Sequence, residues 1–151
     1  MDRHKAGESP RQAADIAANL ELTNVFKQGD EGKDRLIQIA EKFAQELAHK
    51  VKHHQLRNLL DIVIWVKQSH RGIADAPLSA QTRGRLATCR PRLAYMAARD
   101  KTRSLLKLQK SLNALLMDKD AFSRGDDIHR LYEFASALVA YHKYIECEKK
   151  S

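Results

Sequence analysis

The chain has 151 residues, of which 43% are hydrophobic and 30% charged, so it is long and apolar enough to form one globular domain. It has only six glycines and three prolines, which argues against a β-sandwich or barrel and favours long helices. Two cysteines make no disulfide framework, the first residues lack an apolar signal core, and no apolar stretch is long enough to span a membrane. We therefore expect a cytoplasmic protein with no membrane partner.

The positive charge is concentrated in the middle of the chain. The formal net charge is +8, yet residues 50–110 hold 14 Lys and Arg and only three acidic residues, whereas the rest holds 13 basic and 16 acidic residues. A positive centre predicts a polyanion as partner. Nucleic acid is favoured over an anionic membrane because no basic amphipathic helix carries an exposed aromatic face. A structural helical bundle with a solvated basic face stays open as an alternative.

Residues 1–33 are polar and rich in alanine, and they end in the stretch Gln28–Lys33, which contains two glycines. A loose helix over Ala13–Leu22 would have little to bury. We expect this segment to be an N-terminal extension, joined by a flexible linker to a helical domain over residues 34–151.

Apolar residues then recur at intervals of three and four, which predicts amphipathic helices. The first predicted helix covers Asp34–His49, with Asp34 as its N-cap. The second covers His54–Ser69 and is apolar almost all round, which predicts a central, buried helix. We expect Trp65 of this helix to lie in the core.

Three further helices complete the predicted fold. One opens at Pro77, is kinked or restarted at Pro91 and ends near Arg99. The next covers Thr102–Met117, and the last covers Asp126–Glu146. The predicted class is therefore all-α, a compact bundle of about five amphipathic helices with a flexible N-terminal extension.

The sequence contains none of the local motifs HExxH, GxxxxGK[ST], GxGxxG or CxxC. The acidic residues of the basic middle are isolated, and neither Cys89 nor Cys147 has the local surroundings of a nucleophile. His49 and His53 have the i, i+4 spacing of two metal ligands, but the helix break predicted between them favours a basic loop. We predict no catalytic residues, no metal and no cofactor.

No RRM, KH or zinc-finger signature is present. A helix-turn-helix is harder to exclude, although the stretch Gln68–Pro77 is longer than the usual turn, so a helical DNA-binding regulator stays open as an alternative. Tyr95 could stack on bases, but we expect it to lie in the core with its hydroxyl hydrogen-bonded.

Two segments of the sequence are more informative about the class of protein than the composition is. Arg90–Arg99 reads RPRLAYMAAR, and Ala137–Tyr144 reads ALVAYHKY. Together with the basic stretch Lys52–Arg57 (KHHQLR), and in this order, they resemble the small subunit of type III-A CRISPR–Cas effector complexes over about residues 36–146. The chain departs from the family pattern at His53-His54, where Thr or Ser is frequent, and at Ala98, where glycine is frequent.

The resemblance implies a helical bundle without enzymatic activity, stacked in several copies along the guide RNA–target RNA duplex. Its implied partners are the backbone subunits, the large subunit and copies of itself, in antiviral defence. RNA cleavage belongs to the backbone subunits, and DNase and cyclic-oligoadenylate synthesis belong to the large subunit. Because the guide sequence varies, such a subunit would hold the target RNA through phosphates and sugars, not bases.

The predicted RNA contacts are basic side chains of the positive centre: Lys52, Arg57, Arg90, Arg92 and Arg99 first, and Arg85, Lys101 and Arg103 second. Each has the alternative of a solvated helix face, and Arg57 and Arg92 could instead form ion pairs between helices. His142 is expected to be structural and to pack against Tyr95.

Overall fold

Six α-helices account for most of the residues that the structure describes. The computed structural model describes residues 9–72 and 75–150, apart from the side chains of residues 11–17 and 149–150. Its helices are α2 (Pro10–Lys27), α3 (Lys33–Leu47), α4 (His53–Gln68), α5 (Ala80–Arg99), α6 (Leu106–Met117) and α7 (Gly125–Lys150), with a short 3-10 helix η1 (Gly29–Gly32) after α2. Within the described residues there is no β-strand, only an isolated bridge between Pro77 and Arg124. The predicted all-α class is confirmed.

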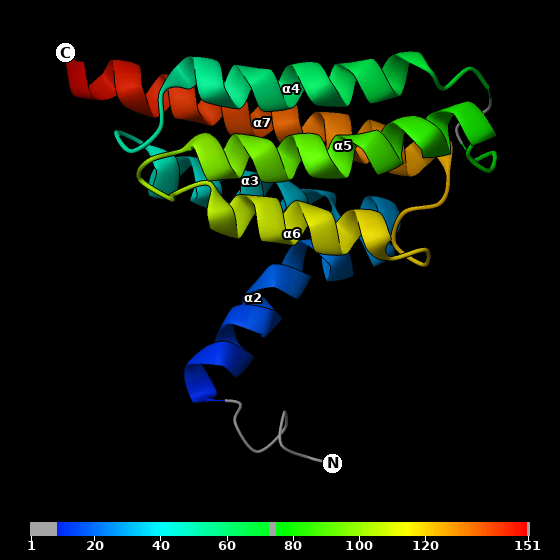
Figure 1. The fold of residues 1–151 in the computed structure, drawn as a ribbon, viewed down its shortest axis with the longest axis horizontal. Coiled ribbons are helices and arrows are strands. Elements are labelled where there is room, and N and C mark those ends of the chain that lie inside the picture. Colours follow the sequence, from blue (N-terminus) through cyan, green and yellow to red (C-terminus); the bar gives the residue numbers. More distant parts are fainter. Residues whose placement is uncertain (1–8, 73–74, 151) are drawn as a thin grey trace.

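The long helix α7 organises the bundle by packing against both α3 and α4. Its buried residues recur every three or four positions, as Ile128, Leu131, Phe134 and Leu138 do, so one face stays inside along most of its length. Phe134 meets Phe43 of α3 edge to face, with ring centroids 6.3 Å apart. On the other side α5 packs between α4 and α6 (Figure 1).

The second half of α2 belongs to the bundle, because it packs against α6 and α3. Leu22, Val25 and Phe26 are buried, and Phe26 stacks on Phe122 with ring centroids 6.1 Å apart. The expectation that this segment has little to bury is therefore wrong for its second half. These three residues form a short i, i+3, i+4 stripe, which the polar and alanine-rich surroundings obscure. The first half of α2 extends away from the other helices (Figure 1).

The stretch expected to be a flexible linker forms the turn η1. Gly32 is buried there, and a Cβ atom on it would lie 2.7 Å from the Val25 carbonyl oxygen, so the close approach of α2 to α3 requires glycine. Gly32 also precedes α3 as its N-cap, in place of the expected Asp34. The domain boundary at residue 33 stays a prediction, and residues 1–8 lie outside the described residues.

The second predicted helix is confirmed as α4, but it is not buried all round. Leu56, Leu59, Val63 and Val66 form its buried face, whereas Trp65 is only partly buried. Among the described elements only α5 and α7 pack closely against α4, so its outer face is not covered by them. Hydropathy alone overestimated the burial of this helix.

The third predicted helix differs from α5 at two prolines. Helix α5 begins after Ser79, whose hydroxyl oxygen accepts a hydrogen bond from the Thr82 N–H at 3.2 Å, so Pro77 does not open it. It also continues through Pro91 without restarting. An unbroken α5 keeps its basic residues in one helical register from Arg83 to Arg99.

Candidate nucleic-acid interface

The α3–α4 and α5–α6 loops lie at the same end of the bundle (Figure 1), and exposed cations are frequent in and beside them. The Thr102 hydroxyl oxygen lies 3.5 Å from the Lys50 carbonyl oxygen, so the two loops are in contact. The cations belong to these loops and to the helix turns beside them: Lys50, Lys52, Arg57, Arg99, Lys101 and Arg103. We call this surface the basic end. Among the described residues, none of these six cations forms an ion pair.

Asp100 holds the α5–α6 loop of the basic end in shape. Its carboxylate accepts hydrogen bonds from the Thr102 hydroxyl at 2.8 Å, the Thr102 N–H at 3.1 Å and the Leu105 N–H at 3.0 Å. Burial alone would raise the pKa of Asp100, but these hydrogen bonds outweigh burial and lower it. The one acidic residue between the loop cations is thus turned inward, because only 4% of Asp100 is exposed.

The start of α4 supplies the other part of the basic end. The backbone N–H of Lys52 donates to Gln55 Oε1 at 2.8 Å, which caps the helix and fixes the loop before it. The Lys52 side chain and Arg57, one turn later, are both exposed. Neither forms the interhelical ion pair considered for Arg57, so both charges are available to a ligand.

His53 anchors the start of α4 on α7. Its ring stacks on His142 with centroids 5.9 Å apart and an interplanar angle of 14°. Burial, followed by the positive charges of Lys143 and other neighbours, lowers the pKa of His53 below 6.5. His142 is fully buried, which agrees with the structural role expected for it. The expected packing of His142 against Tyr95 is wrong, because His142 stacks on His53 and 64% of Tyr95 is exposed.

The ring of Trp65 in α4 contacts two of the arginines of α5 that were predicted to bind RNA. The guanidinium carbon of Arg92 lies 4.4 Å from the centre of the Trp65 ring, and that of Arg85 lies 4.8 Å from it. Arg85 Nη1 also donates to the Trp65 carbonyl oxygen at 2.6 Å. Trp65 is therefore a partly buried platform for two cations and not the core residue expected from the sequence.

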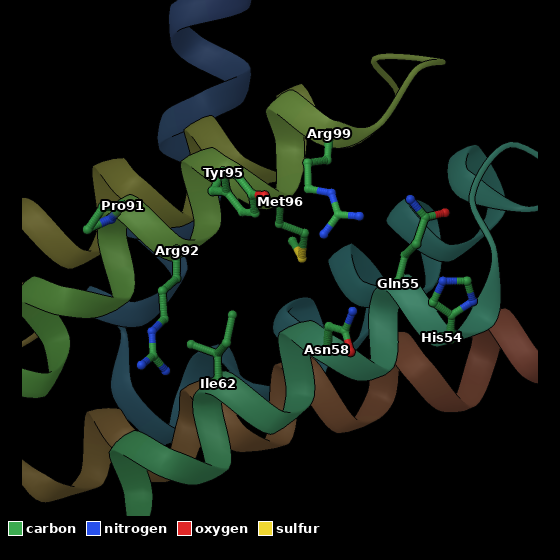
Figure 2. Close-up of a pocket in the computed structure, with 9 residues that line it drawn as sticks. All are labelled: His54, Gln55, Asn58, Ile62, Pro91, Arg92, Tyr95, Met96 and Arg99. Atoms are coloured by element: carbon green, nitrogen blue, oxygen red, sulfur yellow. The ribbon is translucent and has the colours of Figure 1, made fainter.

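A groove of about 550 Å³ lies between α4 and α5. Its lining comes from His54, Gln55, Asn58 and Ile62 of α4 and from Pro91, Arg92, Tyr95, Met96 and Arg99 of α5 (Figure 2). The Arg99 guanidinium carbon lies 5.5 Å from the centre of the Tyr95 ring. The expectation of a core Tyr95 is wrong, because Leu93 and Ala97 occupy the buried face of this helix and Tyr95 points elsewhere.

Seven of the eight predicted contacts therefore fall into three groups. Lys52, Arg57, Lys101 and Arg103 lie at the basic end, Arg99 joins it to the groove, and Arg85 and Arg92 lie on Trp65. Arg90 stands apart, because its Nε donates to Asn113 Oδ1 of α6 at 3.0 Å. The sequence spacing alone could have predicted this separation. Residues 85, 92 and 99 are seven apart and share one face of a helix, whereas residue 90 lies on another face.

No catalytic constellation is evident among these residues. Within residues 9–72 and 75–150, no group of three or more His, Cys, Asp and Glu side chains is placed to hold a metal ion. Burial raises the pKa of the Cys89 thiol to about 11, which leaves it protonated and unreactive at neutral pH. In the same part of the chain no helix is both long and apolar enough to cross a membrane.

The fold and this surface define an all-α small protein whose unpaired cations lie along one end and one groove. The family model described as Csm2 Type III-A matches residues 30–148, and the chain belongs to this family of type III-A CRISPR effector small subunits. It is a structural small-subunit family whose members assemble with the other subunits of the effector, as the resemblance in the sequence implied. No curated protein and no solved structure matches the chain significantly.

Proposed function

We propose that this chain is a non-catalytic, RNA-binding small subunit in the cytoplasm. It stacks in several copies along the guide–target duplex of the effector and holds the target RNA during antiviral defence. The observation that supports this function best is the basic end. Its six exposed cations form no ion pair with a described residue, and the one carboxylate between the loop cations is turned inward.

The contacts of the basic end suit a ligand of varying sequence. Lysine and arginine side chains on helix ends and short loops reach phosphate oxygens, which every nucleotide carries. Repeated copies along one strand need a surface that meets the next copy head to tail. The net negative charge outside residues 50–110 gives a copy an acidic region that could face the positive region of its neighbour.

The proposal is tested by a salt titration of RNA binding with matched double variants. Arg57→Gln with Lys101→Gln removes two cations of the basic end. Lys119→Gln with Arg124→Gln removes the same charge from two exposed residues of the α6–α7 loop, and this loop lies at the opposite end of the bundle (Figure 1). With about 0.7 counterions released per phosphate contact on a single strand, the first variant should lower the log–log salt slope by about 1.4. The second variant should match the wild-type slope.

Three outcomes would overturn the proposal. Equal losses in both variants would mean that net charge, not the basic end, attracts RNA. No binding of the wild type to single-stranded or duplex RNA at low salt would leave only a structural bundle with a solvated face. A strong preference for one double-stranded DNA sequence would favour the DNA-binding regulator.

A further inference from the structure

The groove between α4 and α5 has a chemistry that phosphate binding alone does not require. Its lining combines the Tyr95 ring with the apolar side chains of Ile62, Met96 and Pro91. Two guanidinium groups, those of Arg92 and Arg99, border this apolar surface, and no carboxylate lines the described groove. A ligand that fits would be flat, partly apolar and negatively charged.

The groove lies outside the hydrogen bonds that connect α4 to α5. At the far end of the pair the Ser69 hydroxyl donates to Thr82 Oγ1 at 2.9 Å, and Arg85 donates to the Trp65 carbonyl oxygen at 2.6 Å. Among the described residues no hydrogen bond bridges the two helices beyond Trp65, and the groove lies in that part of the pair, between Ile62 of α4 and Arg92 of α5 and the ends of the two helices at His54 and Arg99 (Figure 2). Its volume of about 550 Å³ lies within the range of sites that take small organic ligands.

Tyr95 is placed to stack on such a ligand. Its exposed fraction of 64% is unusual for a large aromatic residue, and Arg99 lies against its ring and limits its freedom. Arg92 is held in the same way over Trp65. The two arginines are seven residues apart on one helix, so their backbone positions are about 10 Å apart along the axis. They can therefore lie on either side of a base stacked on Tyr95.

We propose that this groove binds an unpaired nucleotide of RNA. The base stacks on Tyr95, and the phosphates on either side of it meet Arg92 and Arg99. Every base offers a flat face, so stacking adds affinity without reading the sequence. A base inside a continuous duplex is already stacked and cannot enter the groove, so the site distinguishes unpaired from paired RNA. This inference rests on the proposed RNA-binding function and adds a feature of the ligand to it.

The test uses a single-stranded RNA that carries 2-aminopurine, whose fluorescence falls when the base stacks. The full chain should quench the probe, and Tyr95→Leu should abolish the quenching and weaken single-strand binding about fivefold or more. Tyr95→Phe keeps the ring and should behave as the wild type. Tyr144→Leu is the matched control, because Tyr144 is also an exposed tyrosine, at 62%, and lies outside the groove. Binding of the fully paired duplex should be the same for all four proteins.

The outcomes separate this inference from the proposed function. If the wild type binds RNA with a steep salt dependence but Tyr95→Leu quenches and binds as the wild type does, the groove assignment is wrong and the basic end stands. If Tyr95→Leu weakens self-association and leaves RNA binding intact, the groove belongs to a second copy and the inference is overturned. If the wild type binds no RNA, both proposals fail.

Discussion

Replacing Asp100 by asparagine should destabilise the chain by removing the charge that orders the α5–α6 loop. The side chain is 4% exposed and accepts hydrogen bonds from the Thr102 hydroxyl, the Thr102 N–H and the Leu105 N–H. An asparagine keeps one acceptor oxygen but turns an NH₂ group toward donors. Leu105 is fully buried, so an unsatisfied N–H there cannot turn to water.

The size of the effect follows from these contacts. A hydrogen bond to a charged group contributes about 1.5–3 kcal/mol net, and a buried donor left without an acceptor costs a similar amount. Because one oxygen is retained, we expect Asp100→Asn to lose about 2–3 kcal/mol of the free energy of unfolding. That loss corresponds to a fall of roughly 5–10 °C in Tm for a chain of this size. Urea unfolding followed by circular dichroism measures it directly.

The pH dependence of the difference in unfolding free energy between the wild type and Asp100→Asn provides a second check. The hydrogen bonds lower the pKa of native Asp100 below its ordinary value of 3.8, so the unfolded chain binds the proton more readily. The stability advantage of the wild type over Asp100→Asn should be complete above pH 3.8 and should shrink as the pH falls through the lowered native pKa. Asp61→Asn makes the same change at an exposed carboxylate and should leave stability within about 0.5 kcal/mol of wild type. Equal stability of Asp100→Asn and wild type at neutral pH would refute the reasoning.

Other predictions concern the core, the thiols and a histidine. Phe26→Ala should cost about 3 kcal/mol or more, because it removes a buried ring stacked on Phe122; unchanged urea stability would mean that α2 is not part of the core. A thiol reagent at about pH 8 should label exposed Cys147 quickly and buried Cys89, whose pKa is about 11, only after unfolding; equal rates would contradict this. Burial lowers the pKa of His53 below 6.5, so the unfolded chain binds more protons below that pH and stability falls with acidification; urea unfolding of His53→Gln should show a smaller fall.

Helix positions were predictable from the sequence because burial repeats along them. In α3 the apolar residues Leu36, Ala40, Phe43 and Leu47, which recur at intervals of four, three and four, are all buried, and the helix ends within two residues of the predicted His49. The start of α6 was predicted four residues too early, at Thr102. The reason is local, because the Asp100 carboxylate takes hydrogen bonds from Thr102 and Leu105 and keeps the backbone between them out of the helix.

Aromatic residues were harder to place than helices. Trp65 sits among valines and isoleucines and reads as core, yet α4 has close neighbours on two sides only, and its uncovered side receives Arg85 and Arg92. Tyr95 lies between apolar residues, yet Leu93 and Ala97 take the buried positions of α5. Which face of a helix is covered depends on distant segments, and the local pattern does not contain that information.

The charge of the middle segment predicted a basic surface but not its division into parts. Lys52 and Lys101 are 49 positions apart, and they come to the same end of the bundle because α4 packs against α5 and brings the loops before and after them into contact, with the Thr102 hydroxyl 3.5 Å from the Lys50 carbonyl oxygen. Arg90 does not belong to this surface, because its Nε–H donates to Asn113 Oδ1 of α6 at 3.0 Å. Charge counts over a segment indicate the class of ligand, whereas tertiary contacts decide which cations reach it.

The two parts of the surface should differ in how salt affects them. Contacts of the basic end release counterions, so their contribution to RNA binding weakens steeply as salt is added. Stacking on Tyr95 releases none, and its contribution should remain at high salt. The fold loss of single-strand affinity caused by Tyr95→Leu should therefore stay nearly constant as salt is added, while total affinity falls. If the groove acted through Arg92 and Arg99 alone, its contribution to affinity would fall with salt, and Tyr95→Leu would change the affinity little at any salt concentration.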